Sequence, residues 1–134
     1  MSPEMTILAL VTLLYVVAWI PPLVAKCRAW GWRWVATNRS TTGLPPLSEA
    51  GQRAVRAYDN LKENYPPFAV AVLLLAFSGG FTEYTAVAAL LFLIARLIHM
   101  PAYILGTPWL RTPSWLLGLA ATVYLLIMAL VALV

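Results

Sequence analysis

The chain has 134 residues, of which 62% are hydrophobic and only 10% are charged, and its mean hydropathy is +0.81. A soluble domain carries about 25% charged residues, so this composition excludes a water-soluble globular protein and predicts an integral membrane protein. The net charge of +4 does not indicate nucleic-acid binding, because the basic residues stand beside apolar runs, where they orient a membrane protein.

An apolar, uncharged run over about 5–25 predicts the first membrane-spanning helix. We expect this span to be retained, because it lacks the basic start and the small-residue cleavage site of a signal peptide. Pro21 and Pro22 are expected to kink or end the helix. Residues 26–47 should then form a polar, turn-rich connection at the membrane interface, with a short amphipathic segment on the membrane surface as the alternative.

The second predicted helix covers about 48–78, with Ser48 as its N-cap and Ser78-Gly79-Gly80 as its end. Its first half is polar and its second half is apolar. We therefore expect the first turns to rise out of the bilayer, and Pro66 and Pro67 to kink the helix.

Two further apolar segments predict a third span at about 82–105 and a fourth at about 112–134. The fold class that follows is all-α, a single integral membrane domain over 1–134 built as a four-helix bundle. Lys and Arg residues concentrate in the first and third connections. We therefore expect these loops in the cytoplasm and both termini in the periplasm or a lumen.

Ionisable residues inside a span cost about 2.5–3.5 kcal/mol each on insertion scales, yet here they are concentrated on two helices. Residues three or four apart share one face of a helix. This spacing gives two polar stripes, Arg53, Arg56, Asn60 and Glu63 on the second helix and Arg96, His99 and Tyr103 on the third. Asp59 lies beside the first stripe, and Arg111 precedes the fourth span at the same face.

We expect the two stripes to meet inside the bundle rather than face lipid. Pairing of Arg56 or Arg96 with Asp59 or Glu63 would neutralise much of the cost of burial. Two interpretations remain open. The residues form interhelical pairs that only fix packing, or they form a charged pocket for an anionic ligand, since cations exceed acids there.

The sequence predicts no metal site, because His99 is the only histidine and the only cysteine, Cys27, lies in a different loop. A nucleophile activated by His99 is also weakly supported. Neither Ser114 nor Cys27 stands at a spacing from His99 that suggests such a pair.

These patterns resemble a known family. The run Arg53-x-x-Arg56-Ala57-x-x-Asn60-x-x-Glu63-Asn64-x-Pro66 resembles the second-helix signature of the MAPEG superfamily, the membrane-associated proteins in eicosanoid and glutathione metabolism. The run Ala95-Arg96-x-x-His99-x-x-x-Tyr103, followed by Arg111, is similar to that family's second block. With the predicted spans and the long first loop, the resemblance covers essentially the whole chain.

The resemblance implies a homotrimer that binds glutathione as co-substrate between adjacent subunits. It implies a transferase or peroxidase that activates the glutathione thiolate for attack on a lipophilic electrophile drawn from the membrane lipid. A bacterial-type member would lie in the inner membrane. The residues that the resemblance places at the glutathione site are Arg53, Arg56, Asn60, Glu63, Arg96, His99 and Tyr103. Arg111 would be catalytic, because a cation beside the sulfur stabilises the thiolate.

One residue departs from the family pattern. Glutathione-using members often carry a basic residue just before the motif asparagine, where this chain has Asp59. Two alternatives therefore remain: a non-catalytic protein of the same fold that binds another ligand or a lipid in the same pocket, and a small transporter that moves a proton through Glu63. The transporter is disfavoured, because the charges sit at one face instead of along a path through the membrane.

Overall fold

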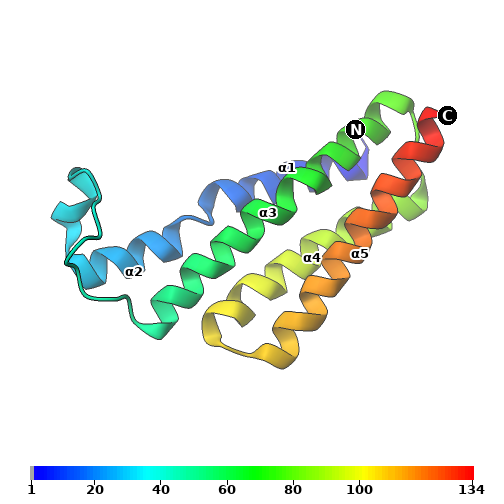
Figure 1. Ribbon diagram of the computed structural model, residues 1–134. Coiled ribbons are helices and arrows are strands. Elements are labelled where there is room, and N and C mark those ends of the chain that lie inside the picture. Colours follow the sequence, from blue (N-terminus) through cyan, green and yellow to red (C-terminus); the bar gives the residue numbers. More distant parts are fainter. Residues whose placement is uncertain (1) are drawn as a thin grey trace.

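The computed structural model describes residues 2–134, which are helical throughout apart from turns and one long loop. The elements are α1 (Pro3–Val17), α2 (Ile20–Trp30), the 3-10 helix η1 (Trp32–Ala36), α3 (Glu49–Ser78), α4 (Glu83–Leu105) and α5 (Pro108–Leu133). Figure 1 shows α1 and α2 as one long bent rod beside three further rods, with both termini at the same end of the bundle. The predicted all-α four-helix architecture is confirmed.

Three segments are long and apolar enough to cross a membrane, namely Pro3–Trp30, α4 and α5. The chain is an integral membrane protein. α3 is not among these segments, since its first half is charged. Its 30 residues rise about 45 Å, which exceeds the roughly 30 Å of a hydrocarbon core. The apolar second half of α3 packs inside the bundle, and the charged turns extend beyond it toward the loops.

The kink expected from Pro21 and Pro22 is observed, and it lies just before them, because α1 ends at Val17 and α2 begins at Ile20. The end of the first predicted span, about 5–25, is wrong, since the apolar segment continues to Trp30. A proline has no N–H to donate and is favoured in the first turn of a helix, where that donor would be unpaired anyway. The two prolines therefore begin α2, which continues to Trp30.

The connection predicted for 26–47 is shorter than expected, because its first residues complete α2 and η1 follows at once. The boundaries of α3 are confirmed: Ser48 Oγ accepts a hydrogen bond from the Gly51 N–H at 3.1 Å, and Gly79 takes a left-handed conformation at the C-terminus. The fourth span begins at Pro108 and not near residue 112, since the same preference for proline in a first turn applies. Arg111 is consequently inside α5.

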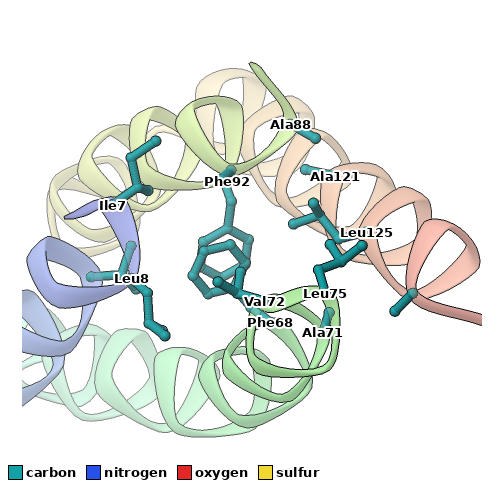
Figure 2. Close-up of a cluster of buried hydrophobic side chains, with 13 residues drawn as sticks. Ile7, Leu8, Phe68, Ala71, Val72, Leu75, Ala88, Phe92, Ala121 and Leu125 are labelled. Atoms are coloured by element: carbon teal, nitrogen blue, oxygen red, sulfur yellow. The ribbon is translucent and has the colours of Figure 1, made fainter. Parts of the chain in front are cut away.

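The apolar core lies between α1, α3, α4 and α5, in the half of the bundle nearest the termini. Phe68 and Phe92 stack at its centre with ring centroids 3.9 Å apart, as Figure 2 shows. Val72, Leu75 and Leu125 close around the two rings and are fully buried. At the end near the termini, Thr85 Oγ1 donates to the buried carboxylate of Glu4 at 2.7 Å, which ties α1 to the start of α4. Nothing in the spacing of the first apolar run indicates that Glu4 is buried.

We predict that Phe68→Ala destabilises the protein in detergent by about 3 kcal/mol, because the substitution leaves an unfilled space against Phe92. Phe77→Ala is the matched control, since Phe77 lies on the same helix and is 90% exposed. Thermal unfolding followed by circular dichroism should show a clear fall in Tm for the first variant and little change for the second. Equal shifts would mean that the stacked pair does not hold the bundle together.

Candidate functional site

Three helices meet at the guanidinium of Arg96. This side chain extends from α4 and is 1% exposed. Its Nη1 donates to Asn60 Oδ1 on α3 at 3.1 Å, and its Nη2 donates to the backbone carbonyl of Trp115 on α5 at 3.4 Å. The guanidinium also lies over the Phe92 ring, 5.3 Å from its centroid. The expected meeting of the two polar stripes is therefore observed for Asn60 and Arg96.

The absence of a side chain at Gly118 makes room for this arginine. A Cβ added there would meet Arg96 Nη2 and would lie 3.0 Å from its Nε. Within residues 2–134 no carboxylate lies within ion-pairing distance of Arg96, and its Nε has no hydrogen-bond partner. The expected neutralisation of Arg96 by Asp59 or Glu63 is wrong. A buried cation without a counter-ion is costly, so this point of the bundle favours a nearby anion.

His99 stands one turn after Arg96 and joins α4 to the first turns of α5. Its Nδ1 lies 3.0 Å from the Arg111 carbonyl and 3.4 Å from Ser114 Oγ. A carbonyl oxygen only accepts, so Nδ1 carries a proton, and in the neutral ring Nε2 keeps the lone pair. Nε2 is buried and has no partner in the described part of the chain. The ring also packs edge-on against Tyr103, with centroids 5.5 Å apart.

A cavity of about 270 Å³ opens beside these groups. Its walls come from α3, α4 and the start of α5, and its lining residues are Asn60, His99, Tyr103, Arg111, Thr112 and Trp115. The Arg111 guanidinium lies over the Tyr103 ring at 4.9 Å from the centroid, which fixes a second cation at the cavity wall. The cavity thus combines hydrogen-bonding groups and cationic charge, and no acid is among its lining residues.

The structure does not bring the other predicted residues into this cavity. Arg53 lies further toward the loops, where its Nε donates to the Ile104 carbonyl at 2.9 Å and its Nη1 lies 3.6 Å from Glu49. Arg56 and Glu63 are exposed on α3. They flank Asn60 on the same helix face, one turn before it and one turn after it.

Asp59 also lies elsewhere. Its Oδ1 is 2.6 Å from Lys62 Nζ, on the side of α3 that faces α2. The expectation that Asp59 pairs with Arg56 or Arg96 is wrong, because one residue along a helix turns a side chain by about 100° and so away from the face of Asn60.

Residues of α5 after Arg111 also contribute to the site, which was not predicted from sequence. Thr112 and Trp115 line the cavity, and Gly118 makes space for the arginine. The spacing of Ser114 from His99 suggests no pairing, yet the Ser114 hydroxyl lies 3.4 Å from His99 Nδ1 and donates to the Arg111 carbonyl at 2.9 Å. One helix face carries the α5 residues of the site, since they are three or four positions apart: Arg111, Ser114, Trp115 and Gly118. This spacing could have indicated their role from the sequence.

The comparisons decide the family. A model of the MAPEG family matches residues 5–131, which is nearly the whole chain. The chain belongs to the MAPEG family. A comparison with curated protein sequences gave no match. The family match covers every residue of the cavity, and the α3 and α4 stripes by which the chain resembles MAPEG proteins are the ones that meet at Arg96.

We predict that Gly118→Ala is destabilising only while Arg96 is present. The added methyl group would displace the guanidinium from its hydrogen bonds to Asn60 and Trp115. In an Arg96→Ala background the same substitution has free space, so the two effects should be non-additive by about 1 kcal/mol or more. Tm values of the four proteins measure this coupling. Strict additivity would show that Gly118 does not serve to accommodate the arginine.

Proposed function

We propose that this MAPEG protein is a membrane glutathione transferase or peroxidase, which activates the glutathione thiolate for attack on a lipophilic electrophile. The observation that carries the proposal is the cavity lined by Asn60, His99, Tyr103 and Arg111, next to the buried and unneutralised Arg96. An anionic ligand in this cavity would offset the charge that the protein leaves unpaired.

The charges of glutathione suit the α3 face that leads out of the cavity. The tripeptide has two carboxylates and one ammonium group. Arg56 and Glu63 are seven residues apart, so they stand about 10 Å from each other along α3. An extended tripeptide has about the same length. We infer that Arg56 binds a carboxylate, that Glu63 receives the ammonium, and that Asn60 lies between them.

In this arrangement Arg111 is the residue that acts on the sulfur. A cation close to a thiol stabilises the thiolate, which is the nucleophile. With an aryl halide, the thiol proton passes to solvent, the sulfur forms a bond to the ring carbon, and the halide leaves. We infer that such substrates reach the cavity from the bilayer, toward which the helices present exposed apolar side chains.

We further infer a homotrimer in a bacterial inner membrane, with the site at its cytoplasmic face. The inference rests on family membership and on the basic residues of the loops beside the site. Arg56 and Glu63 are exposed in the isolated protomer, where a neighbouring subunit would enclose the ligand against them.

The proposed transferase activity predicts that Arg111→Ala lowers kcat/KM for glutathione conjugation of a model aryl halide by about 100-fold. Loss of the cation raises the pKa of the bound thiol, so the rise of activity with pH should move to higher pH. Arg33→Ala is the control, because Arg33 is an exposed loop cation outside the cavity and should retain full activity.

Two results would contradict this assignment. Absence of conjugation by the wild-type protein, with glutathione still bound, would favour the alternative of a non-catalytic ligand-binding protein. Equal losses for both variants would show that Arg111 has no special place relative to the sulfur.

The trimer is tested separately. Native mass spectrometry in mild detergent should give a particle of three times the 14.7 kDa protomer mass. A protomer or a dimer as the main species would contradict the proposed assembly.

A further inference from the structure

A second cavity lies on the other side of α3 from the one described above. It has a volume of about 380 Å³ and is enclosed by α2, the loop around η1, and the charged half of α3. It shares no lining residue with the cavity that is lined by Asn60, His99 and Arg111. Its lining residues are of two kinds, the apolar and aromatic ones, here called the apolar wall, and the charged ones, here called the basic wall.

The basic wall carries a net positive charge. Lys26, Arg39 and Lys62 line it, together with a single acid, Asp59. Asp59 is already paired with Lys62 at 2.6 Å, and Lys62 also lies 4.8 Å from the centroid of the Tyr58 ring. Within residues 2–134, Lys26 and Arg39 have no carboxylate within 4.0 Å. Two cations therefore face one cavity without a counter-ion.

The loop that supplies Arg39 is held in place by its own hydrogen bonds. Arg39 has a left-handed backbone conformation with φ of 55°, which is unusual for a residue other than glycine. Its N–H donates to Thr37 Oγ1, and its side-chain Nε donates to the Val35 carbonyl. The Trp34 indole N–H donates to the Ser40 carbonyl at 3.0 Å and closes the loop. The exposed arginine is thus held at the mouth of the cavity by its own loop.

The apolar wall is suited to a hydrocarbon chain. It consists of Trp19, Pro22, Leu23, Trp34 and Val55. Tryptophan side chains concentrate at the depth of lipid headgroups, and Trp19 stands where α1 passes into α2. The basic lining residues suit the phosphate of a phospholipid, and the apolar ones suit the upper part of an acyl chain.

We propose that this cavity binds one anionic phospholipid, with the headgroup phosphate between Lys26 and Arg39 and an acyl chain along Leu23 and Val55. The charge favours an anionic lipid over a zwitterionic one, because the headgroup of a zwitterionic lipid would place a third cation beside Lys26 and Arg39. Arginine and lysine are the usual phosphate ligands in proteins. The site is independent of glutathione binding.

The experiment places the purified protein in nanodiscs of phosphatidylcholine with 10% phosphatidylglycerol and counts retained lipids by native mass spectrometry. The double variant K26Q/R39Q should retain about tenfold less phosphatidylglycerol than the wild type. The control R28Q/R33Q removes the same charge from the same segment but from residues outside this cavity, and it should retain the lipid. Circular dichroism confirms that each variant is helical.

A second variant keeps every charge. Leu23→Trp fills the apolar wall and should also lower phosphatidylglycerol retention, whereas an attraction that is only electrostatic would be unaffected by it. If K26Q/R39Q and R28Q/R33Q lost phosphatidylglycerol equally, the lipid would be held by the overall charge of the surface and not by this cavity, and the proposal would be overturned. Unchanged retention in K26Q/R39Q would overturn it as well. A change in oligomeric state without a change in lipid retention would assign the cavity to contact between copies of the chain.

Discussion

The guanidinium of Arg96 is the group on which the arrangement of this bundle depends. It is buried where α3, α4 and α5 meet, and no carboxylate of residues 2–134 lies within 4.0 Å to balance it. Moving an ion from water into a protein interior costs several kcal/mol, so the groups around the Arg96 guanidinium must stabilise its charge. Asn60, the Trp115 carbonyl and the Phe92 ring do so in part, and Gly118 provides the space.

This constraint also joins the core to the site. The Phe92 ring stacks on Phe68 and also lies under the Arg96 guanidinium, so the apolar half of the bundle contacts the polar half directly. The division follows from the sequence of α3, whose first turns are charged and whose later turns are apolar. Because α3 is one continuous helix, the change from charged to apolar residues along it sets where the polar site ends and the apolar core begins.

The stripes on α3 and α4 could be predicted from sequence, because spacings of three and four fix which residues share a helix face. Their depth of burial could not, since Arg56 and Asn60 share a face and yet one is exposed and the other lines a cavity. The partner of Arg96 on α5 is the backbone carbonyl of Trp115, and every residue has such a carbonyl, so no residue type in the sequence indicates this contact.

Two other features needed the structure because they depend on rotation about a helix axis. Asp59 departs from the family pattern, yet it faces α2 and Lys62, so its carboxylate does not line the cavity beside Asn60. Pro21 and Pro22 indicated an interruption correctly, but only the helix ends decide on which side of a proline pair the break falls.

The central claim is that unbalanced cationic charge in the bundle is there to bind an anionic peptide. Isothermal calorimetry with glutathione and with its dimethyl ester, in which both carboxylates are blocked, tests this claim directly. We expect glutathione to bind at millimolar concentration or below and the ester to bind at least about tenfold more weakly, a difference of about 1.4 kcal/mol. Equal affinities for the two ligands, or no binding of glutathione at millimolar concentration, would contradict the account.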